Sequence, residues 1–216
     1  MDNNRDYVST EFPPYQTGKK LFALESKLKK NEQNPIMVHD GKIGITIQDY
    51  SNGTGDKNVI VRANINPSDV SILKKKMDAI EVMKHFKYTN RDELLSQSKI
   101  FGLPMTEGPY TGLCKVTKLF ITRNPIINNE PARFPISVTV ENGYGKKNVR
   151  ENGATMIAPN SYQKDKSATI QMSDDDFSSQ IYAVENHIKV FDIMYGGKIL
   201  YPLYDNRWTA ASNYGK

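Results

Sequence analysis

Residues 41–70, GKIGITIQDYSNGTGDKNVIVRANINPSDV, contain two strand patterns, the turn that joins them and the start of a helix. In residues 42–48 the apolar side chains occupy every second position and so share one face of a strand: Ile43, Ile45 and Ile47. Residues 51–55 have the composition of a turn, and residues 58–65 resume the β pattern. We therefore predict a β-hairpin.

A helix is expected directly after this hairpin. Residues 66–69, Asn-Pro-Ser-Asp, supply an N-cap, a proline at the first helical position and an acid at the third, which suit the free N–H groups of a helix start. Apolar residues follow at helical spacing: Val70, Leu73, Met77 and Ile80. With a further strand expected at residues 20–25, this part of the chain is predicted to be strands followed by one amphipathic helix.

The second half of the chain repeats this order. Strands are expected at residues 118–123, 135–141 and 167–172, and Ser173 is expected to cap a helix with these apolar residues: Phe177, Ile181, Val184 and Ile188. The halves share two short patterns, Lys-Leu-Phe at 20–22 and 118–120, and Gly-x-Gly-x-Lys-Asn at 53–58 and 143–148. We predict an α+β fold of two related units, each an antiparallel β-sheet followed by an amphipathic helix. The alternative is an ordinary α+β chain whose turns look alike.

Composition shifts divide the chain into segments. The expected boundaries are an N-terminal arm at 1–18, a first unit at 19–101 ending in a short helix at 91–100, a connector at 102–114, a second unit at 115–191 with an insertion at 142–166, and an aromatic tail at 192–216. The arm should be loose unless it docks, and the insertion is either a mobile finger or a plain surface insertion. We expect the tail to pack on its own protein or to join a homo-oligomer.

Composition also bounds the class of protein. The 216 residues include 29 Lys and Arg and 24 Asp and Glu, a formal net charge of +5. A chain of this length can fold without disulfides or metals, and its single cysteine, Cys114, excludes an internal disulfide. The chain lacks an apolar run long enough for a membrane span, and its N-terminus lacks the apolar core of a signal peptide. We therefore expect a soluble, cytoplasmic protein without a membrane partner.

Patterns typical of catalytic sites are missing from the sequence. The histidines His39, His85 and His187 are far apart, and none forms a pair at metal-binding spacing. The acidic residues 174–176 directly follow Ser173, so capping and the helix dipole account for them better than Mg²⁺ does. Glycine-rich nucleotide-binding fingerprints are incomplete. We expect no metal, no cofactor and no catalytic activity.

Basic and aromatic residues recur together on the expected strands and hairpin tips. Lysine and arginine neutralise phosphates, and tyrosine rings stack on bases whatever the sequence, so the combination is typical of single-stranded nucleic-acid binding. Tyr50 and Tyr144, at the tips, have no obvious core to fill. The expected nucleic-acid-binding residues are Lys20, Tyr50, Lys57, Arg62, Lys118, Arg123, Tyr144, Lys146, Lys147, Arg150 and Tyr162.

These patterns resemble a known group of proteins. Residues 41–47, continued by 66–73, resemble the strand, hairpin, strand and helix of the positive transcriptional coactivator, and the twofold order is similar to the Whirly and Pur-alpha single-stranded DNA-binding proteins. The resemblance implies a twisted sheet that binds the strand, with helices behind it or in a dimer. It also implies four strands in each half, and residues 36–38 could supply the fourth in the first half.

The expected function is therefore that of a sequence-tolerant, non-catalytic single-stranded DNA-binding protein of replication, recombination or repair. The Lys- and Asn-rich chain would suit a phage or a mobile element. Whether the ligand is DNA or RNA is left open. Two alternatives also stay open: an OB-type barrel with the same ligand, and a protein-interaction module such as a phage inhibitor or assembly factor.

Overall fold

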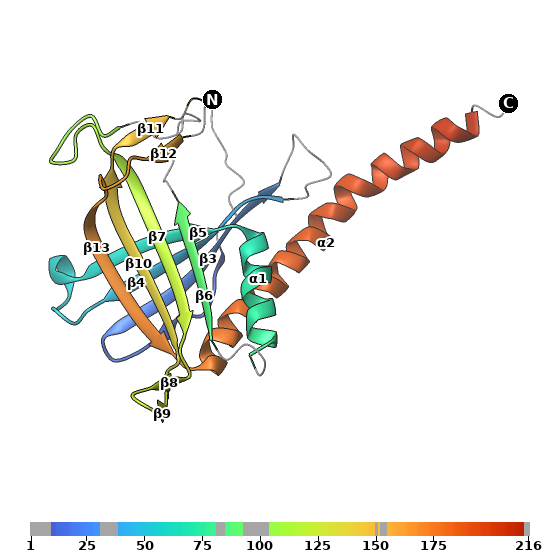
Figure 1. Ribbon diagram of the computed structural model, residues 1–216. Helices are drawn as coiled ribbons and strands as arrows, with labels where there is room; N and C mark the ends of the chain where they lie inside the picture. Colours follow the sequence, from blue (N-terminus) through green and yellow to red (C-terminus); the bar gives the residue numbers. More distant parts are fainter. Residues whose placement is uncertain are drawn as a thin grey trace.

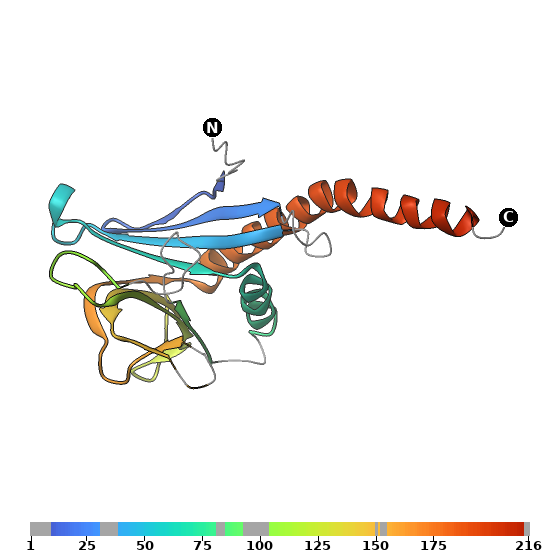
Figure 2. The ribbon, with the colours of Figure 1, turned by 90° about the horizontal axis from the view of Figure 1, so that it is seen from above.

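Two large antiparallel sheets, two small two-stranded ladders and two α-helices make up the described part of the fold (Figure 1). The computed structural model describes residues 10–30, 39–80, 85–92, 104–149, 151 and 155–213. Seen from above, one sheet lies against the other, and both helices lie at the same side of the pair (Figure 2). The chain thus has a mixed α+β fold, as the strand and helix patterns predict.

The first sheet is a meander of three long strands with two short strands added at its edge. β3 pairs with β4 and β4 with β5, while β1 and β2 both pair with β3, all antiparallel. The strands are β1 (Thr10–Glu11), β2 (Tyr15–Gln16), β3 (Lys20–Lys30), β4 (His39–Asp49) and β5 (Val59–Ile65), with the 3-10 turn η1 (Gly55–Lys57) before β5. This confirms the predicted hairpin.

Helix α1 (Pro67–Asp78) follows the first sheet and starts as predicted. The backbone N–H of Asn66 donates to Asp69 Oδ2 at 2.9 Å, which completes the capping box. Its apolar face is buried through Val70, Leu73 and Met77. The cap and the apolar spacing together decide where this helix begins and which side faces the core.

The second sheet has four strands in the order β13-β10-β7-β6, again a meander. The strands are β6 (Phe86–Asp92), β7 (Cys114–Arg123), β10 (Ile136–Gly145) and β13 (Gln163–Met172). Two small ladders lie in its connections, β8 (Ile126–Ile127) with β9 (Glu130–Pro131), and β11 (Lys147–Val149) with β12 (Thr155–Ile157). Helix α2 (Asp174–Asn213) follows β13, and its start is capped by Ser173, whose Oγ accepts the Asp176 N–H at 3.1 Å.

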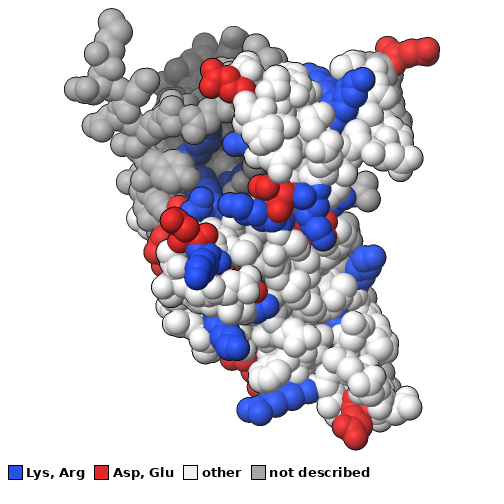
Figure 3. All heavy atoms as spheres, turned by 90° about the vertical axis from the view of Figure 1, so that its left-hand side faces the viewer, with Lys and Arg blue, Asp and Glu red and all other residues white. Residues whose placement is uncertain are grey.

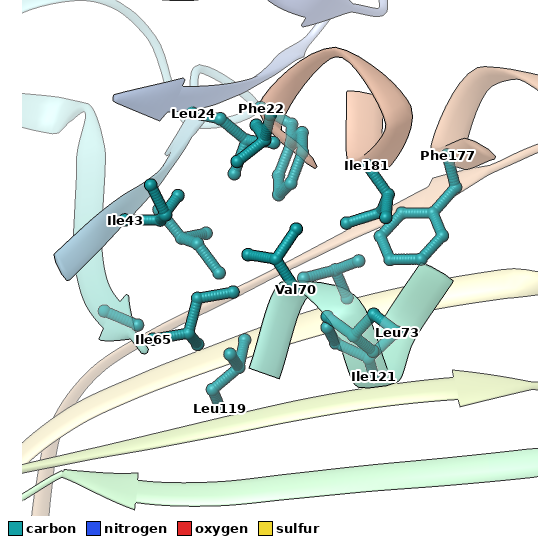
Figure 4. Close-up of a cluster of buried hydrophobic side chains, with 14 of the residues drawn as sticks. Phe22, Leu24, Ile43, Ile65, Val70, Leu73, Leu119, Ile121, Phe177 and Ile181 are labelled. Carbon is teal, nitrogen blue, oxygen red and sulfur yellow. The ribbon is translucent and has the colours of Figure 1, made fainter. Parts of the chain in front are cut away.

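One hydrophobic core lies between the sheets and the helices. Buried side chains from both sheets and both helices belong to the same cluster. Figure 4 shows them converging from four directions: Phe22, Leu24, Ile43 and Ile65 from the first sheet, Leu119 and Ile121 from the second, Val70 and Leu73 from α1, and Phe177 and Ile181 from α2. The two sheets therefore form a single folded unit.

An asparagine side chain joins the two sheets where β5 crosses the second sheet. The Arg62 N–H donates to Asn142 Oδ1 at 2.9 Å, and Asn142 Nδ2 donates to the Arg62 carbonyl oxygen at 2.8 Å. Asn142 Nδ2 also lies 3.1 Å from Thr117 Oγ1 on the neighbouring strand β7. The side-chain amide thus pairs with the backbone N–H and carbonyl groups of Arg62 at the edge of β5, as a neighbouring strand would.

The strand boundaries depart from expectation in the first half. Residues 86–92 form β6, which pairs with β7, so the helix expected from residue 91 does not begin there, and residues 93–100 lie outside the described part. The boundary between the sheets therefore precedes residue 86 and does not coincide with the expected connector at 102–114. The arm is docked from residue 10 onward and supplies edge strands, whereas residues 36–38 are not described.

Two expectations for the second half are corrected. The tail at 192–216 is not a separate segment, because α2 continues to residue 213. The insertion at 142–166 is partly sheet, since its ends belong to β10 and β13 and its middle forms β11 and β12. In the described part of the chain neither large sheet closes on itself, so the OB-type barrel is wrong.

No helix in the described part of the chain combines the length and the apolar character needed to cross a membrane.

Candidate nucleic-acid interface

Two tyrosines stack on each other at the far end of the second sheet. Tyr144 lies near the end of β10, opposite Lys115 of β7. Its ring is stacked on that of Tyr110, with 3.7 Å between centroids and 13° between planes. Both side chains are only partly buried. The surface therefore carries a stacked aromatic pair that forms without a ligand.

The loop before β7 holds Tyr110 in this position. Gly108 and Gly112 both have positive φ, +85° and +81°, which glycine adopts without strain. Thr111 Oγ1 donates to the Gly108 carbonyl oxygen at 2.7 Å, and the Leu113 N–H donates to the Tyr110 carbonyl oxygen at 3.0 Å. The hydroxyl of Tyr110 donates to Asp165 Oδ1 at 3.0 Å, and this bond raises the pKa of Tyr110.

A third tyrosine lies close by, over β10. A Cβ at Gly143 would come within 2.8 Å of the Tyr162 ring, so only glycine leaves room for the ring there. Lys118 Nζ lies 3.3 Å from the centroid of the same ring, a close cation–π contact. Burial, and then the negative charge of Glu141, raise the pKa of Tyr162 to about 12. Lys164 Nζ lies 3.7 Å from Glu141 Oε1.

Six lysines lie on the same strands and connections as these three tyrosines. We call the whole group the tyrosine–lysine end: Tyr110, Lys115, Lys118, Glu141, Tyr144, Lys146, Lys147, Tyr162, Lys164, Asp165 and Lys166. It holds six lysines but only two acids, and four of the lysines are exposed: Lys115, Lys146, Lys164 and Lys166. Figure 3 shows the side of the molecule on which β13 lies, with basic atoms gathered in a band and carboxylates among them.

Five of the expected binding residues lie at this end of the second sheet: Lys118, Tyr144, Lys146, Lys147 and Tyr162. Successive residues of a strand point to opposite faces, so Tyr144 lies on one face of β10, and the Tyr162 ring with Lys118 covers Gly143 on the other. Three more belong to the first sheet. Lys57 is exposed in the turn before β5, and Arg62 is exposed on β5, where its backbone meets Asn142 of the second sheet. Tyr50 follows β4 and its hydroxyl is hydrogen-bonded to Gln48. Arg150 lies outside the described residues.

The remaining two expected residues are engaged in holding the fold. Lys20 Nζ lies 3.0 Å from Asp49 Oδ2 and donates to the Thr169 carbonyl oxygen at 2.7 Å, which links the first sheet to β13. Arg123 forms a two-pronged pair with Asp174 at the start of α2, through Nε at 2.9 Å and a terminal nitrogen at 2.7 Å, and its side chain is 11% exposed. We therefore infer that both residues stabilise the fold.

Sequence patterns missed Tyr110 and the acids Glu141 and Asp165. Tyr110 lies in a Gly/Pro-rich segment, which predicts only a connector. Its pairing with Tyr144 depends on the fold-back of the loop onto β10, which no local pattern indicates. The sequence does carry one local signal for Tyr110: glycines that suit turns lie on both sides of it, at Gly108 and Gly112. Such a pattern indicates a tight loop that holds the tyrosine ring in a fixed position.

A serine and a histidine are in contact inside the core. Ser26 Oγ and His187 Nε2 are 2.9 Å apart, as in a serine nucleophile with its base, but Ser26 is wholly buried and the Phe12 ring packs edge-on against His187. No group of three or more His, Cys, Asp or Glu in the described ranges could hold a metal ion. The cavity inside the core is lined by apolar side chains such as Phe22 and Phe177.

No protein-family model, no curated protein and no solved structure matches the chain.

Proposed function

We propose that the protein binds single-stranded nucleic acid, without catalysis and with little sequence preference, through the tyrosine–lysine end. The observation that carries the proposal is the stacked pair of Tyr110 and Tyr144 at the surface, with Lys115 opposite Tyr144 on β7 and Lys166 opposite Asn142 on β13. A base can continue an existing aromatic stack, and every base has a face to offer, so such a stack favours single strands of any sequence.

The lysines beside the stacked pair favour a nucleic acid whose bases are accessible, as they are in a single strand. Lysines on either side of the stacked pair, such as Lys115 and Lys166, can contact the phosphates next to a stacked base. In duplex DNA the base faces are already stacked on each other, so a duplex would use the lysines alone. Lys57 and Arg62 extend the basic surface onto the first sheet, because Asn142 ties β5 to β10.

The order of elements is similar in the two halves. In each half a meander of antiparallel strands is followed by one helix, β3-β4-β5 by α1 and β6-β7-β10-β13 by α2. That order is a mixed α+β arrangement, and the likeness to the Whirly and Pur-alpha proteins rests on the sequence patterns alone. Such proteins cover exposed single strands, so we place the activity in replication, recombination or repair.

The test is fluorescence anisotropy of labelled oligo(dT) titrated with the protein at two salt concentrations. Affinity should fall as salt rises, with a slope of about 0.7 per phosphate contact. Replacing Tyr144 by Ala should weaken binding by about 1–3 kcal/mol with little change in slope, whereas replacing Lys115 and Lys166 together should lower the slope. Oligo(U) in parallel decides between DNA and RNA.

Matched controls come from other parts of the chain. Phe134 is an exposed aromatic residue beside Arg133, in the segment that leads into the other end of β10, and Lys189 is an exposed lysine on α2. Ala at either position should leave affinity unchanged. If Tyr144→Ala and Phe134→Ala bind equally well, or if duplex competes as well as single strands, stacking is not the mechanism. Absence of binding at low salt would favour the protein-interaction module.

A further inference from the structure

The C-terminal half of α2 extends beyond the two sheets (Figures 1 and 2). The helix has 40 residues and is therefore about 60 Å long. Its residues that face the core recur at alternating spacings of four and three: Phe177, Ile181, Val184, Ile188, Phe191 and Tyr195. The next positions of this series are Lys198, Pro202 and Asp205, and two of these three residues are charged. The face that packs on the sheets and α1 thus ends near Tyr195.

A second apolar stripe begins on the other side of the same helix. Val190, Ile193 and Met194 are 52%, 75% and 56% exposed. The same helical spacing continues through Gly197, Leu200, Tyr201, Tyr204 and Trp208. At 100° per residue, these positions lie opposite the series that packs on the core. A helix with apolar stripes on two opposite sides is typical of one that packs against two surfaces.

We propose that this second stripe, residues 190–208, pairs with the same stripe of a second copy of the chain in an antiparallel, twofold-symmetric dimer. Lys198 and Asp205 are seven residues apart, and at 100° per residue both lie on one side of the helix, between the core-facing series and the stripe, where they flank the stripe. A twofold axis between residues 201 and 202 places Lys198 of each copy opposite Asp205 of the other. In a parallel pair this flank of one copy would lie on the opposite side of the interface from the same flank of the other, so Lys198 and Asp205 would not meet. The charge pattern is therefore complementary to its own antiparallel copy.

The size of the stripe fits a stable dimer. The stripe holds three aromatic residues, Tyr201, Tyr204 and Trp208, and each residue of this kind can bury about 150–250 Å². Together with Val190, Ile193 and Met194 they reach the roughly 800 Å² per partner of a standard interface. Gly196, Gly197 and Pro202 are among the least favourable residues for a helix interior. A projecting helix that contains them needs packing from outside its own fold, which the second copy supplies.

Light scattering coupled to size-exclusion chromatography tests the dimer on the full chain without nucleic acid. The wild-type protein should have twice the 24.5 kDa mass of one chain. Ile193→Glu and Leu200→Glu should each reduce the mass to that of the monomer. Ser179→Glu is the matched control, because Ser179 is an exposed residue on the same side of α2 but precedes the stripe. It should leave the dimer intact.

Charge reversal tests the antiparallel pairing without adding a charge to the stripe. Lys198→Glu should raise the dimer dissociation constant about fivefold, and the double variant Lys198→Glu, Asp205→Lys should restore it. A wild-type monomer, or a dimer that survives both Ile193→Glu and Leu200→Glu, would overturn the proposal. A double variant as weak as Lys198→Glu would overturn the antiparallel arrangement. None of these readouts depends on nucleic-acid binding.

Discussion

Replacing Asn142 by Ala removes the side chain that joins the two sheets. Three hydrogen bonds are lost, two to the Arg62 backbone and one to Thr117 Oγ1. Each is worth about 0.5–1.5 kcal/mol net. Arg62 is exposed, so water can replace part of its two bonds, whereas Thr117 is 1% exposed and its hydroxyl loses a buried partner. We therefore expect a loss of about 2–3 kcal/mol in the free energy of unfolding.

Urea denaturation followed by circular dichroism measures this loss. The midpoint should fall while the m-value stays constant, because the surface exposed on unfolding is unchanged. Asn64→Ala is the control on β5, the strand that Asn142 contacts, since the Asn64 side chain accepts a long bond of 3.5 Å from Lys27, and it should cost less than about 0.5 kcal/mol. Asn142→Asp should lower the free energy of unfolding more than Asn142→Ala does, because a carboxylate would face the Arg62 carbonyl oxygen. A variant Asn142→Ala as stable as Asn64→Ala would refute the reasoning.

Three further predictions concern single side chains. Burial lowers the pKa of His187, so the folded protein binds fewer protons there than the unfolded chain does. The free energy of unfolding should therefore fall as the pH drops below about 6.5. His187→Gln should make this fall smaller in urea titrations at several pH values. The Tyr162 hydroxyl should ionise only near pH 12, and Tyr162→Phe should remove that phase from an ultraviolet absorbance titration. Gly143→Ala should cost about 2 kcal/mol or more in thermal unfolding, because its Cβ would lie 2.3 Å from the Gln163 carbonyl oxygen. Gly44→Ala should cost less than about 1 kcal/mol, since its Cβ meets the flexible ends of the Lys27 and Glu25 side chains. Equal costs for the two glycines would contradict this.

Local patterns predicted the elements whose boundaries have local causes. The alternation of Ile43, Ile45 and Ile47 placed β4, and the caps at Asn66 and Ser173 placed the starts of both helices. In each case the physical cause lies within a few residues of the boundary, as an unpaired N–H group or a buried face. Such causes can be recognised without knowing the rest of the fold.

Elements that depend on distant partners were not predicted. β6, Phe-Lys-Tyr-Thr-Asn-Arg-Asp at 86–92, has no clean alternation, and its backbone is satisfied by the edge of β7. The short strands at residues 10–16 form because β3 offers them an edge. α2 continues to residue 213 through Gly196, Gly197 and Pro202, against local propensity. In the candidate site, Tyr110 was missed for the same reason.

The single core has a consequence for cutting the chain. A protease that nicks the loop around Gly108 would leave an N-terminal fragment that contains β6 and a C-terminal fragment that contains β7, still joined along that ladder. Lys20 would still bind the Thr169 carbonyl oxygen, and the apolar side chains of both fragments would still share their cluster. The nicked protein should therefore migrate as one particle in a native gel, and the two fragments should reassemble when mixed after separation in denaturant.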